Sequence, residues 1–141
     1  MTDIELLSAF ENYSLPAAEF HHADHVRVAF LYLCRFPPIE AVRRFSEGLR
    51  SFAAHNGKPD RYHETITWAF LFLIRERVAR TARPEQTWEE FAAANPDLLD
   101  WKNNVLKKYY SEATLTSDLA RSTFVLPDLG VSDRASASLE L

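Results

Sequence analysis

The longest strongly apolar run of the chain is Ile66-Thr67-Trp68-Ala69-Phe70-Leu71-Phe72-Leu73-Ile74. It places large apolar side chains on every side of a helical wheel, which predicts a helix that is buried all round. The helical spacing extends from residue 63 to residue 81. In a domain of this size we expect such a helix to lie at the centre, with the other helices packed around it. A membrane span needs roughly 20 apolar residues, so the run predicts a buried helix and no membrane association.

Helical spacing also dominates the rest of the sequence. Only three glycines occur, and the alternation of apolar and polar residues that marks strands is scarce. Two capping boxes, Thr2 with Glu5 and Thr87 with Glu90, indicate helix starts. The predicted fold is all-α, a compact bundle of about six to seven helices around the helix at residues 63–81. Helices are expected at residues 3–13, 22–36, 38–55, 63–81, from 88 onward, 97–110 (burying Trp101) and 117–124.

Residues 1–130 are expected to form a single helical domain, followed by a disordered polar tail at residues 131–141. The formal net charge is −4, and nucleic-acid binding usually needs a clustered basic excess, so no nucleic acid is expected as a partner. A single cysteine excludes an intrachain disulfide. The N-terminus carries acids where a secretory signal would carry bases. Together these observations predict a cytoplasmic protein.

A histidine cluster is the most chemically suggestive feature of the sequence. On a wheel of the helix at residues 22–36, His22 and His25 point to the apolar face and His21 lies at its edge. His63 shares a face of the next long apolar helix with Thr67. If these two helices pack with their N-terminal ends adjacent, the three imidazoles converge, and Glu64 is the natural fourth group.

Such an arrangement suits a transition metal. Neutral imidazole is the commonest side-chain ligand for these ions, and a third histidine or a carboxylate completes a catalytic site. We therefore predict His22, His25 and His63 as metal ligands, with Glu64 as a further ligand or the catalytic general base. The expected cofactor is a divalent transition metal (zinc, iron or nickel). The predicted function is a small metal-dependent enzyme or metal-binding protein.

Four further residues are candidates for contact with a small-molecule substrate. Thr67 lies one turn after His63, and Arg61 and Tyr62 come directly before His63. Tyr109 ends the helix expected at residues 97–110. Arg121, in contrast, is expected to be buried and paired with an acid.

Two other functions stay open at this point. One is a metal-free protein that binds a small ligand, with His63 and Glu64 as a polar or acid–base pair. The other is a homodimeric interaction module whose histidines are structural. Metal content, a ligand-dependent rise in melting temperature and a concentration-dependent mass would separate the three.

Three runs carry a resemblance to known proteins: Phe20-His21-His22-Ala23-Asp24-His25, Tyr62-His63-Glu64-Thr65-Ile66-Thr67 and Phe124-Val125-Leu126-Pro127-Asp128. They resemble runs of small bacterial helical proteins of uncharacterised function, which implies the same helical fold but no activity. The chain is also loosely similar to DinB-type bundles, which hold a metal with three histidines from facing helices. Those bundles usually carry a His-x-x-x-His pair late in the chain, so none of their residue roles is transferred here.

Overall fold

The computed structural model describes residues 1–81, 83 and 85–130. These residues form helices and no strand, which confirms the predicted all-α bundle. The tail expected at residues 131–141 lies outside the described residues. The elements are α1 (Asp3–Glu11), η1 (Ala17–Glu19), α2 (His22–Arg35), α3 (Pro38–His55), η2 (Pro59–Arg61), α4 (Glu64–Arg80), α5 (Trp88–Ala94), α6 (Pro96–Leu99), η3 (Val105–Lys108), α7 (Glu112–Leu115) and α8 (Asp118–Ser122).

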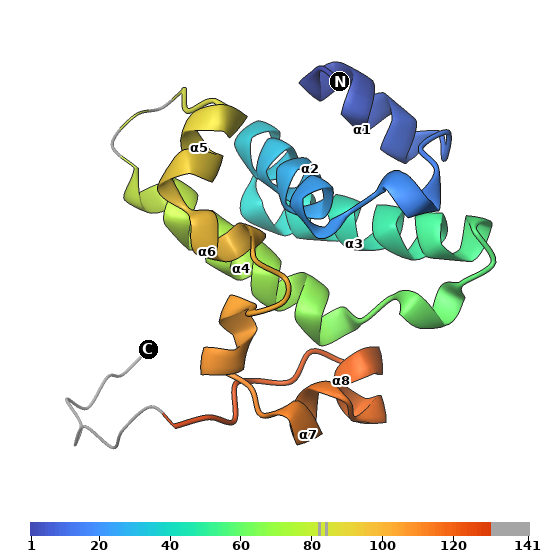
Figure 1. Cartoon of the computed structure of the whole chain (residues 1–141), viewed down its shortest axis with the longest axis vertical. Helices are drawn as coiled ribbons and strands as arrows, with labels where there is room; N and C mark the ends of the chain where they lie inside the picture. The colour runs from blue at the N-terminus through green and yellow to red at the C-terminus, as the bar shows by residue number, and fades with distance from the viewer. Residues whose placement is uncertain (82, 84, 131–141) are drawn as a thin grey trace.

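Two helices share the centre of the bundle (Figure 1). α2 contacts α1, α3, α4, α5 and α6, whereas α4 packs against α2 and α3 on one side and against α8 near its start. The expectation that residues 63–81 are buried all round is wrong on one side, because Phe72 is 45% exposed. Among the described residues, no helix combines the length and the apolar character needed to cross a bilayer.

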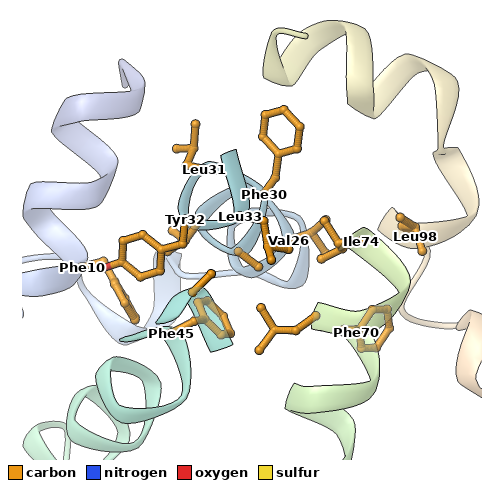
Figure 2. Packing of buried hydrophobic residues seen from close by; sticks show 14 of the residues in the cluster. Phe10, Val26, Phe30, Leu31, Tyr32, Leu33, Phe45, Phe70, Ile74 and Leu98 are labelled. Atoms are coloured by element: carbon orange, nitrogen blue, oxygen red, sulfur yellow. The ribbon is translucent and has the colours of Figure 1, made fainter. Parts of the chain in front are cut away.

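Phe10 fixes α1 to the rest of the core (Figure 2). Its side chain is fully buried, and its ring centroid lies 5.4 Å from that of Phe20, 6.0 Å from that of Phe45 and 5.8 Å from that of Phe52. Aromatic pairs at such distances add about 0.5–1.5 kcal/mol each beyond the burial of their area. α1, the loop before α2, and α3 are therefore joined through one aromatic cluster.

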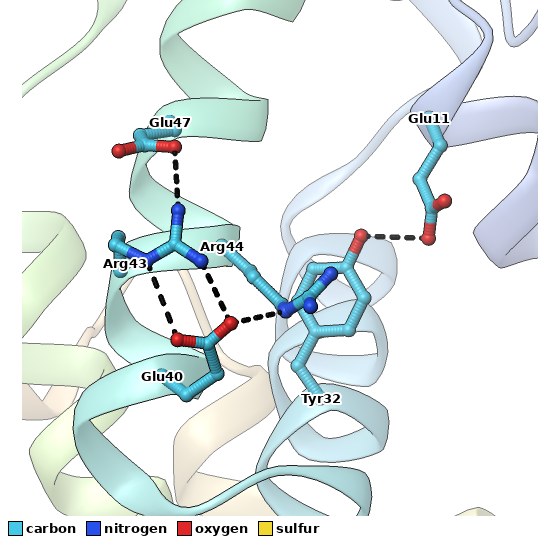
Figure 3. A network of polar contacts seen from close by, with 6 residues as sticks. All are labelled: Glu11, Tyr32, Glu40, Arg43, Arg44 and Glu47. Atoms are coloured by element: carbon cyan, nitrogen blue, oxygen red, sulfur yellow. Dashed lines mark hydrogen bonds and ion pairs between the residues drawn. The ribbon is translucent and has the colours of Figure 1, made fainter.

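Polar contacts join α1 to α2 and side chains of α3 to one another on the outer side of this aromatic cluster (Figure 3). The Tyr32 hydroxyl of α2 donates to Glu11 of α1 at 2.9 Å. On α3, Glu40 accepts from Arg43 at 2.7 Å and from Arg44 at 2.8 Å. These exposed ion pairs contribute little stability, because water and salt screen them. They keep the charges of α3 on its solvent face, which leaves its apolar face for the interior.

The helix expected at residues 97–110 is wrong. It is interrupted after Leu99 and resumes only as the short η3. Asp100 accepts from the Asn103 amide at 3.0 Å, and Asn104 accepts from the Leu106 amide at 2.8 Å. Such side-chain bonds to nearby amides compete with helical bonds. Trp101 lies in this turn and is 50% exposed instead of buried.

The chain after α8 returns to the start of α4. The Thr65 hydroxyl, fully buried, donates to the Thr123 carbonyl at 2.8 Å and accepts from the Val125 amide at 3.1 Å. Further along, the Asp128 carboxylate accepts from the amide and the hydroxyl of Ser111. Two of the three runs that carry the resemblance, residues 62–67 and 124–128, are therefore in direct contact. Their contact stabilises the tertiary structure.

Gly48 gives a first testable prediction, because it lies in the middle of α3 against Phe10. Alanine normally stabilises a helix interior by roughly 0.5–1 kcal/mol relative to glycine. A Cβ at residue 48 would lie 2.9 Å from Phe10 Cε2, in a core where overpacking costs about 1–3 kcal/mol. We expect Gly48→Ala to lower the free energy of unfolding by about 1 kcal/mol, measured by urea denaturation.

Two controls separate the clash from helix propensity. Ser51→Ala, on the exposed face of α3, is expected to be neutral or slightly stabilising. In a Phe10→Leu background the cost of Gly48→Ala should disappear. An equal cost in both backgrounds would contradict the clash.

Candidate functional site: a cavity between α2, α3 and α4

A cavity of about 470 Å³ lies between the three long helices. Its volume falls in the range of about 300–1,000 Å³ that is typical of small-molecule sites. Its deep end is formed by three buried residues, Ala29, Phe45 and Ile74. Phe20, Val26, Leu49, Phe52, Ile66, Phe70 and Leu71 also line it. The cavity walls are therefore mainly aliphatic and aromatic.

The three predicted histidines all line this cavity. Residues at the N-terminal ends of both α2 and α4 therefore belong to its wall. The imidazoles do not meet around a single point, however, because His22 and His63 are each held by a hydrogen bond to a distant backbone carbonyl.

His63 uses both ring nitrogens on the backbone. As the N-cap of α4 it accepts a hydrogen bond at Nδ1 from the Ile66 amide at 3.1 Å. Nε2 lies 2.7 Å from the Leu115 carbonyl of α7. Because an amide N–H needs a bare Nδ1 and a carbonyl needs a donor, the ring is the neutral tautomer protonated at Nε2. His63 thus ties the start of α4 to the C-terminal segment.

His22 and His25 lie one turn apart on α2. Nε2 of His22 lies 2.9 Å from the Leu98 carbonyl of α6, and its ring packs 4.9 Å from Phe70 and 5.0 Å from Trp101. The ring of His25 packs on that of Phe20, with 4.0 Å between the centroids. His22 is therefore held by a backbone carbonyl and two aromatic rings, whereas His25 packs on the ring of Phe20.

Burial keeps all three imidazoles neutral at pH 7. It lowers the pKa of His25 to about 4, and the neighbouring His22 adds to this effect. Burial also lowers the pKa of His22, against the opposing effects of the Leu98 carbonyl and Asp100. The pKa of His63 is lowered by burial and by the nearby Arg121, against the Leu115 carbonyl. The cavity therefore has polar but uncharged groups in its wall.

This geometry does not fit a three-histidine metal site. A metal ligand needs a free nitrogen lone pair, and the only lone pair of the neutral His63 ring faces the Ile66 amide. Among the described residues, no three His, Cys, Asp or Glu side chains are placed to hold one ion. Only one free nitrogen of His22 and the ring of His25 are left for a ligand, so we assign no step to a metal.

Glu64 is directed away from the cavity, which it does not line. Its carboxylate accepts a short hydrogen bond from the Tyr62 hydroxyl and pairs with Arg50 at 3.4 Å. The Arg50 guanidinium also lies over the Tyr62 ring, 4.7 Å from the centroid. Burial and the Glu64 contact raise the pKa of Tyr62 to about 12. Glu64 thus positions the aromatic wall residue Tyr62.

The remaining predicted substrate contacts divide between the cavity and the surface. Tyr62, Thr67 and Arg61 line the cavity. The Thr67 hydroxyl donates to the His63 carbonyl at 2.7 Å, so its donor is already used. Tyr109 is 40% exposed and lies in a shallow hollow beside Phe72, apart from the cavity.

Sequence reasoning missed part of the mouth of the cavity. Lys58 and Arg121, both exposed, line it beside Arg61. Arg121 was expected to be buried and paired with an acid; instead its guanidinium donates to the Asp60 carbonyl at 2.6 Å. Trp101, expected in the core, also lines the cavity. Lys58 could have been predicted from the sequence, because it lies three residues before the candidate residue Arg61.

No known protein family, curated protein or solved structure matches the chain. The resemblance to small bacterial helical proteins therefore stays a prediction.

The bonding of His63 predicts the effect of replacing it. His63→Ala removes the N-cap of α4 and leaves the partly buried Leu115 carbonyl without its donor, which should lower the free energy of unfolding by about 2 kcal/mol in urea denaturation. His63→Asn, which restores a good N-cap, should recover about 1 kcal/mol of this loss. Equal losses in both variants would contradict the capping role.

His25 predicts a pH dependence of stability. Its pKa is about 4 in the folded protein and 6.5 in the reference state, so the unfolded chain binds the proton more tightly. The contribution of the neutral ring is complete above pH 6.5 and is lost as the pH falls toward 4. Between pH 7 and 5 the wild type should lose about 2 kcal/mol more than His25→Gln.

The measurement is urea denaturation of both proteins across this pH range. His55→Gln, at an exposed histidine, is the matched control and should follow the wild type. A wild type and a His25→Gln variant with parallel pH profiles would show that His25 titrates normally.

Proposed function

We propose that the chain binds a small molecule in the cavity between α2, α3 and α4, without a metal ion. The observation that carries this proposal is the cavity itself, about 470 Å³ in volume with mainly apolar walls. Apolar pockets with a few polar groups are the usual form of ligand sites. His22, His25 and Thr67 are the polar groups that would orient the ligand.

The bonding of the histidines favours this function over a metal-dependent enzyme. Metal binding by His63 would break its bond to the Ile66 amide or to the Leu115 carbonyl. A ligand in the cavity, in contrast, leaves both bonds in place. The homodimeric module stays a prediction. A cytoplasmic location is part of the proposal, because Cys34 is free and exposed, the state that a reducing compartment maintains.

A neutral fluorescent probe, N-phenyl-1-naphthylamine, tests the proposal. We expect it to bind the wild-type protein and to gain emission, because its rings leave water. Ala29→Leu should abolish or strongly weaken this binding, because the larger side chain enters the deep end of the cavity. The melting temperature of this variant should be equal or higher, since it fills empty space.

Ala41→Leu is the matched control. Ala41 is fully buried on α3 but does not line the cavity, so overpacking should cost about 1–3 kcal/mol while the probe still binds. Binding should also survive EDTA, in protein whose metal content is measured by elemental analysis. Unchanged binding in Ala29→Leu would place the probe elsewhere, and loss of binding with EDTA would restore the metal hypothesis.

A further inference from the structure

We propose that the ligand of this cavity is an amphipathic organic anion, with its charged group held at the mouth by Arg61 and Lys58 and its apolar body directed toward Ala29 and Ile74. The inference rests on the proposed function and names the chemical class of the ligand. It is carried by the distribution of charge around the cavity.

Every charged side chain that lines the cavity is basic. Lys58, Arg61 and Arg121 line it, and no Asp or Glu of the described residues does. The chain as a whole carries a net charge of −4, so this cluster runs against the average of the surface. Low-dielectric walls focus the field of such a cluster into the cleft.

The three cations are gathered by one short turn. Lys58 is the residue before η2 and Arg61 is its last residue, and the Arg61 amide donates to the Lys58 carbonyl at 3.0 Å. Both residues line the cavity, so this turn brings their side chains to the same site. The bond from Arg121 to the Asp60 carbonyl brings α8 to the same turn. Their proximity is therefore built into the fold.

These cations have donors to spare. Within the part of the chain that the structure describes, none of the three forms an ion pair. Arg121 uses one guanidinium nitrogen on the Asp60 carbonyl, and Asp60 itself does not line the cavity. An arginine fork matches a carboxylate in two parallel hydrogen bonds, and Lys58 can add a third.

The interior suits the other part of such a ligand. The wall beyond the mouth is apolar, and the imidazoles of His22, His25 and His63 are neutral, so no charge is available to a second ionic group. The wall follows α4 from His63 to Ile74, a rise of about 16 Å. An elongated chain or a fused ring with one charged end fits this shape, whereas a cation, or an anion with a second charge at its far end, leaves a charge uncompensated.

A matched pair of probes tests the inference. 8-Anilino-1-naphthalenesulfonate has the skeleton of N-phenyl-1-naphthylamine plus one sulfonate. We expect the anionic probe to bind about tenfold more tightly at low salt, and the difference to shrink as salt is added. In displacement of the neutral probe, decanoate should compete better than 1-decanol, and decylamine should compete worst.

Variants test whether the preference for the anionic probe comes from the basic side chains at the mouth of the cavity. The double change Lys58→Gln with Arg61→Gln should weaken the anionic probe about tenfold and the neutral probe less than twofold. Lys108→Gln, at an exposed lysine on η3 away from the cavity, should change neither. Circular dichroism checks that the double variant is folded, and because both side chains are exposed we expect full folding.

The outcomes separate the two proposals. If the neutral probe binds but the anionic probe has no advantage, or if the double change weakens both equally, the inference is overturned and the proposed function stands. If neither probe binds, both fall. A tenfold advantage that disappears in the double variant and persists in Lys108→Gln supports both.

Discussion

The two hydrogen bonds of the His63 imidazole join the C-terminal segment of the protein to the start of α4. His63 accepts from the Ile66 amide and donates to the Leu115 carbonyl, 52 residues later. The first bond starts α4 and the second holds the C-terminal segment against that start. Thr65 adds a second attachment of the same kind, through Thr123 and Val125. Together with the packing of α8 on α4, these bonds place α8 so that Arg121 reaches the turn at η2.

The cavity is a consequence of this arrangement. α4 follows its N-cap His63 and packs its Phe70 against His22 in the first turn of α2, and the aromatic cluster around Phe10 fixes α3 as the third wall. His22 is held in turn by the Leu98 carbonyl of α6. His22 and His63 thus each use a ring nitrogen to hold a backbone carbonyl beside the cavity, while burial lowers the pKa of both imidazoles and keeps them neutral. The cavity therefore has an apolar interior and a mouth lined by basic side chains.

Local patterns predicted most helix bounds. Capping boxes at Thr2 and Thr87 mark the starts of α1 and α5 correctly, and Pro38 begins α3 as a first-turn proline does. The error at residues 97–110 has a local cause, since Asp100 and Asn104 bind nearby amides and interrupt an apolar spacing that otherwise suits a helix. The helical wheel also placed His22 and His25 on the inner face. It could not reveal that the Leu98 carbonyl holds His22 or that the Leu115 carbonyl holds His63, because these carbonyls are 76 and 52 residues away from the histidines. The hypothesis of a metal site was made without knowledge of these bonds. The meeting of Arg61 and Arg121 at the mouth of the cavity also depends on a long-range contact, so the sequence did not predict it.

The central claim is that the space between α2, α3 and α4 holds the apolar part of an anionic ligand. A crystal structure with 8-bromooctanoate tests it most directly, because the anomalous signal of bromine locates the end of the chain. The account predicts a peak between Ala29, Phe45 and Ile74, with the carboxylate at Arg61. A bromine peak outside the cavity, or a metal ion bound to His63, would contradict it.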